Sequence, residues 1–275
     1  MKFAVISDLH IDLHKWNWKL LDNIPSDILT IIVAGDISND VWISTKWLYK
    51  LKQRFTNVIW VAGNHDFYNQ GFHSTRVYNK EYEELYPYPK TVNEIIIYFT
   101  NWCNDHGISF LHRNSVDIDG IKFIGATGWH DFVAGEPFDT NMQTKVWYNV
   151  ISDRYIPWND SYQLDHNNPL NASVLDYEYI KNISSSISTS SVVITHHLPN
   201  RKFCIQRPDD QIWTALHGCF VNTKMENIIN PNIKYWIYGH THQRGIETIN
   251  DTTYICNARG YVNENQNWFP IILKI

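Results

Sequence analysis

Five short groups of polar residues each follow directly after an apolar run in this 275-residue chain. They are Asp8-Leu9-His10, Gly35-Asp36, Gly63-Asn64-His65-Asp66, His196-His197 and Gly239-His240-Thr241-His242. Together they offer two carboxylates, one amide oxygen and several imidazoles as ligands. A mixed set of nitrogen and oxygen ligands suits Mn, Fe, Zn and similar ions, whereas thiolates select softer metals. The groups therefore predict a site for a pair of divalent metal ions.

The positions of these groups explain how they could meet. Each apolar run has the length and composition of a strand that is buried on both faces. Residues that follow parallel strands gather beyond the carboxyl ends of a sheet, where ligands bind in α/β folds. Asp8 and His10 are two residues apart, as are His240 and His242. In extended backbone each pair would point to one side, so we expect all four side chains to face the same site.

A pair of metal ions at such a site would activate water for hydrolysis. Two metal ions about 3.5–4 Å apart can hold the attacking and leaving oxygens of an in-line displacement. Asp36 is suited to bridge them, and a metal-bridging hydroxide would be the nucleophile, since the pKa of bound water falls to about 7 on zinc. The sequence contains no Gly-x-Ser-x-Gly, P-loop or Gly-x-Gly-x-x-Gly motif that would indicate other chemistry.

Strands and helices alternate along the chain. Apolar runs predict strands at 3–6, 28–34, 58–62, 121–126, 192–195, 235–238 and 254–256. Helices are predicted over 41–55, from the capping box of Thr91 and Glu94 to Gly107, over 173–187, and after a second capping box of Thr223 and Glu226. This alternation predicts an α/β layered fold.

No repeat or linker divides the chain, so we expect a single domain over 1–275. The stretches 67–90 and 130–170 lack a strong pattern and contain many aromatic and polar residues. Long irregular segments in compact domains often form lids or binding loops. We therefore expect these two segments to face the substrate.

The composition narrows the class of protein. Hydrophobic residues make up 44% and charged residues 19%, which indicates a globular protein. The formal net charge of −5 argues mildly against nucleic acid as a partner. The four cysteines are scattered, as is typical of a reducing compartment. The N-terminus has no signal-peptide pattern and no apolar run is long enough for a membrane span, so we expect a cytoplasmic protein.

The order and spacing of the five groups resemble those of the calcineurin-like metallophosphoesterase superfamily, from Asp8 to His242. Two further sequence segments, 125–129 and 257–261, resemble segments of uncharacterised bacterial and phage-type members. The resemblance implies a four-layer α/β/β/α sandwich of two mixed sheets flanked by helices. Family members that dephosphorylate proteins carry an acidic-Arg-Gly sequence soon after Gly-Asp. This chain has Ile37-Ser38-Asn39-Asp40 there, which argues against a protein substrate.

The resemblance also implies a role for each residue. One metal would be held by Asp8, His10, Asp36 and His242, and the second by Asp36, Asn64, His196 and His240. His65 would lie beside the substrate phosphate, where with Asn64 it would spread the developing charge and could protonate the leaving oxygen. Asp66 could orient His65.

Other interpretations stay open for single residues. Asp, Asn and Gly also favour turns, although paired histidines do not. His196 and His197 would face opposite sides of a strand, and the family pattern favours His196 as the ligand. Substrate contacts are expected from His197, Arg201, His130 and Arg259, although each arginine alone is more typical of a solvated surface charge.

The predicted substrate is a small phosphomonoester or phosphodiester, such as a nucleotide. A nuclease acting on nucleic acid is the alternative. A scaffold that keeps the fold without the chemistry is less favoured, because all the ligating histidines are present. The sequence specifies neither the native metal nor the oligomeric state.

Overall fold

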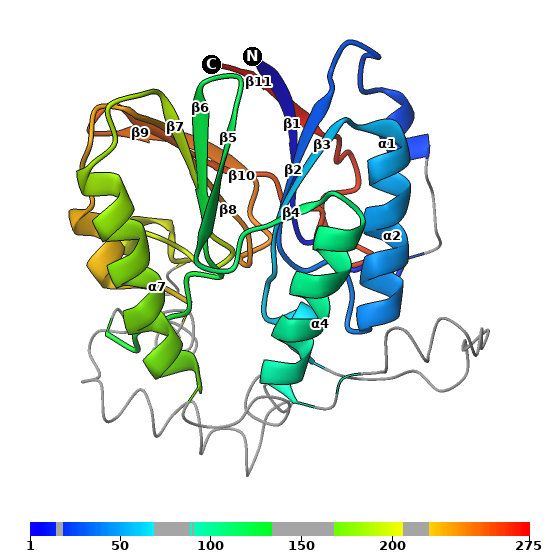
Figure 1. Ribbon diagram of the computed structural model, residues 1–275, viewed down its shortest axis with the longest axis horizontal. Coiled ribbons are helices and arrows are strands. Elements are labelled where there is room, and N and C mark those ends of the chain that lie inside the picture. Colours follow the sequence, from blue (N-terminus) through cyan, green and yellow to red (C-terminus); the bar gives the residue numbers. More distant parts are fainter. Residues whose placement is uncertain (15–18, 69–88, 90, 134–167, 206–219) are drawn as a thin grey trace.

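The computed structural model describes residues 1–14, 19–68, 89, 91–133, 168–205 and 220–275. Two β-sheets lie at its centre, and helices cover their outer faces (Figure 1). The first sheet has the strand order β11-β1-β2-β3-β4. Its strands are β1 (Lys2–Ile6), β2 (Thr30–Ala34), β3 (Asn57–Val61), β4 (Ser109–Phe110) and β11 (Ile271–Lys274). Only β11 runs antiparallel to its neighbour within this sheet.

The second sheet has the strand order β5-β6-β7-β8-β10-β9. Its strands are β5 (Asn114–Ile118), β6 (Ile121–Gly125), β7 (Ser191–Ile194), β8 (Ile233–Tyr238), β9 (Gly245–Ile249) and β10 (Thr252–Cys256). The four inner strands are parallel, and the edge strands β5 and β9 are antiparallel to them. Both sheets are therefore mixed.

Alternate residues of each inner strand pack into two different layers of the core, one between the two sheets and one between a sheet and its helices. Phe3 and Val5 of β1 pack between the sheets, against residues such as Phe123 and Ile194 of the second sheet. Ala4 and Ile6 of β1 instead face the helices. Successive side chains of a strand point to opposite faces, and here both faces are buried. This explains why the strands have continuous apolar sequences.

Within the described residues, three long helices form the outer layers. Helices α2 (Val41–Arg54) and α4 (Val92–Asp105) cover the first sheet, and α7 (Asn168–Ser185) covers the second, as Figure 1 shows. A short helix, α1 (Lys19–Asp22), precedes β2. The predicted four-layer α/β/β/α arrangement is confirmed.

The local signals for α2 and α4 work as expected. The Asp40 carboxylate accepts hydrogen bonds from the backbone N–H groups of Trp42 and Ile43 at the start of α2. The Thr91 hydroxyl accepts one from the Glu94 N–H at the start of α4. Gly107, one residue after the C-cap of α4, has a φ of 65°, which glycine adopts readily.

A short helix forms at the second predicted capping box, but Thr223 and Glu226 do not cap it. The segment Thr223–Asn227 forms a 3-10 helix, η3, whose N-cap is Asn222. Both the N–H and the hydroxyl of Thr223 donate to the Asp131 carboxylate, and Glu226 accepts from Arg201 instead of closing a box. Partners that are distant in sequence take both side chains, and a local signal gives no information about such partners.

Most of the two expected lid segments, 67–90 and 130–170, lies outside the described residues. Of the parts that are described, Phe67, Tyr68 and His130 are buried, and residues 168–170 belong to α7. No helix in the described part of the chain has the length and apolar character needed to cross a membrane.

Asp176 of α7 fastens this helix to the loop that follows β6. Its buried carboxylate accepts hydrogen bonds from the N–H groups of Gly128 at 2.8 Å and Trp129 at 3.2 Å, and it pairs with Arg113 at 2.9 Å. Asp176→Ala would leave two buried N–H groups without an acceptor and a cation without its partner.

We expect Asp176→Ala to lower the free energy of unfolding by about 3 kcal/mol in urea denaturation. Asp176→Asn keeps an acceptor oxygen and should lose less than the alanine variant. A loss below about 1 kcal/mol for Asp176→Ala would show that this connection contributes little.

Candidate metal centre

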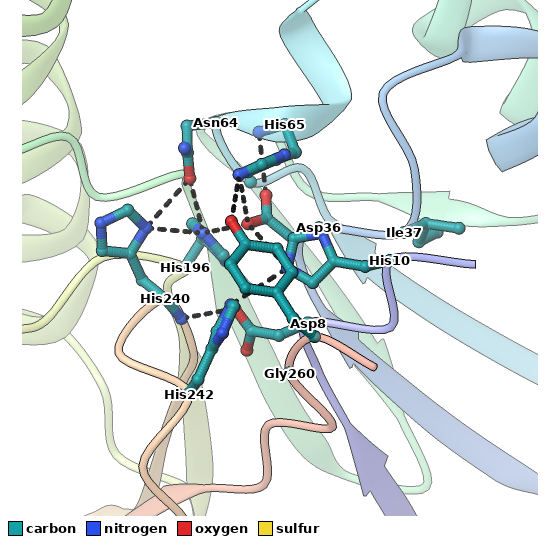
Figure 2. Close-up of polar contacts among 12 residues, drawn as sticks. Asp8, His10, Asp36, Ile37, Asn64, His65, His196, His240, His242 and Gly260 are labelled. Atoms are coloured by element: carbon teal, nitrogen blue, oxygen red, sulfur yellow. Dashed lines mark hydrogen bonds and ion pairs between the residues drawn. The ribbon is translucent and has the colours of Figure 1, made fainter. Parts of the chain in front are cut away.

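The motif residues meet where the carboxyl ends of strands from both sheets come together. Asp8 follows β1, Asp36 follows β2 and Asn64 follows β3 of the first sheet, while His196 follows β7 and His240 follows β8 of the second. Figure 2 shows these side chains converging on one region. Among the described residues, three groups of acidic and histidine side chains have ligand atoms within 4.8 Å of one another, and all belong to this cluster.

The backbone at these residues is not extended, which corrects one expectation. Strands β1 and β8 end before the first ligand of each pair. Positive φ values occur at Asp8 (51°), His10 (40°), Asp36 (55°), His240 (73°) and His242 (55°). Non-glycine residues in this region are strained, and they cluster at functional sites. The paired side chains therefore reach the centre through tight left-handed turns, and the two-residue period of a strand does not apply.

The first group of potential ligands is Asp8, His10 and His242. The Nε2 atoms of His10 and His242 are 3.0 Å apart, and His242 Nε2 lies 3.6 Å from Asp8 Oδ1. His10 Nε2 is also 3.8 Å from Asp36 Oδ2. These distances bring together the side chains that the family resemblance assigns to one metal.

The second group is Asp36, His196 and His240, joined by the amide of Asn64. His196 Nε2 lies 3.3 Å from Asp36 Oδ2 and 2.9 Å from Asn64 Oδ1. His240 contributes Nδ1, which is 3.0 Å from Asn64 Oδ1 and 3.2 Å from His196 Nε2. Asp36 therefore lies between the two groups, as Figure 2 shows.

Hydrogen bonds on the outer side of the ligands fix which atoms face inward. His196 donates its Nδ1–H to the Ala34 carbonyl at 3.0 Å, and Asn64 donates its amide N–H to the Tyr68 hydroxyl at 2.6 Å. In the neutral form of His196, the lone pairs of its Nε2 and of Asn64 Oδ1 consequently face each other and Asp36 Oδ2. Acceptors that converge in this way need a cation between them. The residues present therefore fit divalent metal ions.

The charges of the cluster lead to the same conclusion. Burial by itself would lower the pKa of His196, but Asp36 and Asp8 outweigh it and raise this pKa to about 9. Burial opposes the charge of Asp36 as well, yet nearby His196 and His65 hold its pKa well below the usual value. A proton on His196 thus occupies the place of a cation, and metal binding would displace it.

His65 lies at the edge of the cluster with one nitrogen turned toward it. Its Nδ1 is 2.6 Å from Asn39 Oδ1, and its backbone N–H donates to Asp36 Oδ1 at 2.9 Å. Its Nε2 lies 4.0 Å from Asp36 Oδ2. Burial lowers the pKa of His65 to about 4 although Asp36 opposes the shift. The neutral ring, with Nδ1–H donated to Asn39, is therefore the resting form.

Asp66 contacts the backbone near the ligands and not the His65 ring. Its carboxylate accepts hydrogen bonds from the N–H groups of Asp36 (2.9 Å), Ile37 (3.1 Å) and Gly63 (2.9 Å). It thereby fixes the turn that carries Asp36. The expectation that Asp66 orients His65 is wrong in its geometry, because Asn39 makes that contact.

Gly35 is needed because a ligand lies directly against it. A Cβ atom at this position would stand 2.3 Å from His196 Nδ1, and the residue has a φ of 86°. Any side chain would displace His196 and strain the turn. This explains why glycine precedes Asp36.

His197 and His130 lie behind the ligands. The His197 ring is buried, 4.4 Å from the His240 ring and 4.8 Å from the Trp129 ring, and the His130 ring is 5.2 Å from that of His197. Burial lowers the pKa of His130 to about 3, so this ring is neutral. The structure thus brings His196 into the ligand cluster and leaves its neighbour outside it.

The two candidate arginines point elsewhere. The Arg201 guanidinium pairs with Glu226 at 3.0 Å, and its side chain is half exposed. Arg259 Nη1 lies 3.5 Å from the Leu9 carbonyl oxygen. Within the described part of the chain neither guanidinium contacts a proposed ligand.

Sequence reasoning missed three residues that contact the cluster: Asn39, Glu264 and Tyr261. Asn39 follows the Gly-Asp motif but resembles a helix-capping residue. Glu264 Oε2 lies 2.6 Å from His242 Nδ1, and the Tyr261 hydroxyl lies 3.4 Å from His65 Nε2. For Tyr261 and Glu264, the one sequence signal is the segment 257–261, which includes Tyr261 and ends three residues before Glu264.

Comparisons with known proteins agree with this geometry. The family described as calcineurin-like phosphoesterase matches residues 1–244. An uncharacterised protein of Acanthamoeba polyphaga mimivirus is 24% identical over 296 residues, covering 96% of this chain and 93% of its own length. A phosphopantetheinyl hydrolase from Mycobacterium tuberculosis has a similar fold, with a TM-score of 0.71, 16% identity, and coverage of 98% of this chain and 95% of its own.

The match spans most of the chain and includes every proposed metal ligand, from Asp8 to His242. The chain therefore belongs to the calcineurin-like phosphoesterase family.

Proposed function

We propose that this protein hydrolyses phosphoesters with a pair of divalent metal ions, held by Asp8, His10, Asp36 and His242 on one side and by Asp36, Asn64, His196 and His240 on the other. The observation that carries the proposal is the position of Asp36. Its Oδ2 lies 3.3 Å from His196 Nε2 and 3.8 Å from His10 Nε2, so one carboxylate serves both ligand groups.

When bound, the two cations supply a water of lowered pKa as nucleophile and positive charge against the phosphoryl oxygens. Mn, Fe and Zn all suit the nitrogen and oxygen ligands. Asn64 is held by Tyr68, and it presents its amide oxygen to the centre. The backbone bonds of Asp66 keep the Asp36 turn rigid, so the ligands are preorganised.

His65 is placed to contact the substrate phosphate and then the leaving oxygen. Asn39 holds its Nδ1–H, which leaves Nε2 facing the centre. The negative charge of a bound phosphoester would raise the pKa of His65 above its value of about 4. The ring could then carry a proton to the departing alcohol.

A small phosphomonoester or phosphodiester is the proposed substrate. The stretch after Asp36 lacks the arginine of protein phosphatases, and the fold is shared with a hydrolase of phosphopantetheinyl groups. The cytoplasm is the proposed location, since the described cysteines Cys103, Cys204 and Cys256 are free thiols.

The test is hydrolysis of p-nitrophenyl phosphate and bis(p-nitrophenyl) phosphate by purified protein with added Mn²⁺, with the bound metal measured in the same samples. We expect turnover of at least one ester and about two metal ions per chain. Folded, metal-loaded protein that hydrolyses neither ester would refute the proposed activity.

A nuclease is the second candidate, because the metal centre would act on any phosphodiester. The net charge of −5 counts against a nucleic-acid surface. Binding of a labelled oligonucleotide that weakens steeply between low and high salt would favour the nuclease, and its absence would favour small esters.

A further inference from the structure

The segment that follows β10 contributes to the centre although it lies beyond the matched residues 1–244. Ala258 forms a parallel bridge with Ser7, next to the first ligand, and the Gly260 N–H donates to the Asp8 carbonyl at 2.9 Å. Figure 2 places Gly260 on the side of the centre where Asp8 and His242 lie. We call residues 258–265 the C-terminal loop.

Glu264 connects this loop to a proposed metal ligand. Its Oε2 accepts hydrogen bonds from His242 Nδ1–H at 2.6 Å and from the Tyr261 N–H at 2.7 Å. Asn265 adds a bond from its amide to the His242 carbonyl at 2.8 Å. Gly260 makes room for this arrangement, because a Cβ there would stand 2.5 Å from Glu264 Oε2, and its φ is 76°.

The Tyr261 ring packs over the first ligand group. Its centroid is 4.7 Å from that of His10 and 4.5 Å from that of His242. Its hydroxyl lies 3.4 Å from His65 Nε2. The side chain therefore extends from the ligands toward the residue proposed to meet the phosphate, and 40% of the residue remains exposed to solvent.

We propose that Tyr261 is a substrate-contacting catalytic residue, whose hydroxyl donates a hydrogen bond to a phosphoryl oxygen beside His65, and that Glu264 is the positioning residue that holds it there. This inference rests on the proposed function and adds to it a residue outside the five groups of predicted ligands. The bond would contribute to substrate affinity and grow stronger as negative charge develops on the phosphoryl oxygens.

The residues around the centre favour Tyr261 as the hydrogen-bond donor to the substrate. The candidate guanidiniums are directed to other partners, Arg201 to Glu226 and Arg259 to the Leu9 carbonyl. A hydroxyl at the rim of the centre supplies a donor without adding charge next to the proposed cations. Because Glu264 bonds both His242 and the Tyr261 backbone, the ligand and the donor are held in one geometry.

The first experiment uses Tyr261→Phe, which keeps the ring on His10 and His242 and removes only the hydroxyl. We expect kcat/KM for the better of the two nitrophenyl esters to fall about 10-fold to 100-fold, and inorganic phosphate to bind about 10-fold more weakly to the Mn²⁺-loaded protein in calorimetric titration. Bound metal and thermal stability should stay unchanged. The control is Tyr49→Phe, whose exposed ring on α2 makes an edge-to-face contact with His106.

Phosphate affinity and kcat/KM within twofold of the wild-type values would overturn the assignment of Tyr261. Phosphate binding is measured without turnover. A wild-type protein that binds phosphate but cleaves no ester would therefore refute the proposed function, while the effect of Tyr261→Phe on phosphate affinity would still decide the contact.

The second experiment compares Glu264→Ala with Glu264→Gln. The amide oxygen of Gln can still accept a hydrogen bond, so Glu264→Gln should recover most of the phosphate affinity that Glu264→Ala loses. In samples with equal bound metal, so that the contact of Glu264 with His242 does not enter, combining Glu264→Ala with Tyr261→Phe should add little further loss, because the remaining effect of Glu264 passes through the same hydroxyl. Fully additive losses, or equal losses for the two Glu264 variants, would overturn its role in positioning Tyr261.

Discussion

Replacing Asp36 by Asn is expected to lower the phosphoesterase activity by about three orders of magnitude or more, which corresponds to about 4 kcal/mol of transition-state stabilisation. Asp36 Oδ2 is near the inward nitrogens of both His10 and His196. An amide oxygen carries no full charge and bridges two cations poorly. The variant keeps the shape of the side chain, so the fold should be retained.

Metal analysis distinguishes this explanation from general damage. The Asn variant should bind fewer metal ions than the wild type in the same Mn²⁺ solution, with an unchanged circular dichroism spectrum. Asp117→Asn is the matched control. Its exposed carboxylate pairs with Lys122 near the amino end of β6, and the centre lies beyond the carboxyl ends of the parallel strands. Full metal content and activity in Asp36→Asn would contradict the proposed bridging role.

The sequence was sufficient to predict the layers and to identify side chains that gather at one centre, and the reason is physical. Inner strands such as β2 are buried on both faces, which leaves a continuous apolar sequence. Asp and Asn directly after such strands can be turn residues, but the paired histidines there are not explained by turns and indicate function. Helices α2 and α4 could be predicted as well, because the Asp40 and Thr91 side chains accept hydrogen bonds from backbone N–H groups only two or three residues away.

Features that depend on partners distant in sequence could not be predicted from the sequence. The edge strands β5 and β9 are half exposed and lack continuous apolar runs, and the edge strand β4 has only two residues. Glu264 lies 22 residues beyond His242, and only the folded turn at Gly260 brings them together. The left-handed backbone at Asp8 and His242 could not be inferred from residue types, since neither is a glycine.

His65 and Asp66 show the same limit within one motif. They are adjacent, and the motif suggested that the carboxylate orients the ring. The chain instead turns Asp66 inward to three backbone N–H groups, while Asn39 from the neighbouring loop meets the ring. Motif order thus identifies which residues gather at a centre, and tertiary structure decides which of them touch.

Replacing His65 by Ala is expected to lower kcat by about 100-fold to 10,000-fold while the bound metal stays near the wild-type amount. His65 Nε2 is 4.0 Å from Asp36 Oδ2, and Asn39 holds the other nitrogen of the ring. The ring is thus placed for the substrate, whereas the proposed metal ligands form complete groups without it. The measurement is the steady-state kcat for one ester, together with metal analysis of the same sample.

An ester with a better leaving group sharpens this test. If His65 protonates the departing oxygen, the loss in His65→Ala should shrink for p-nitrophenyl esters relative to alkyl esters, since p-nitrophenolate needs little protonation. His106→Ala is the control, because His106 follows α4 and lies just before the first residue of β4, whereas the centre lies beyond the carboxyl ends of the strands. Loss of metal from His65→Ala would reassign this residue as a ligand, and the group of His10, Asp36 and His65 would then describe a metal site.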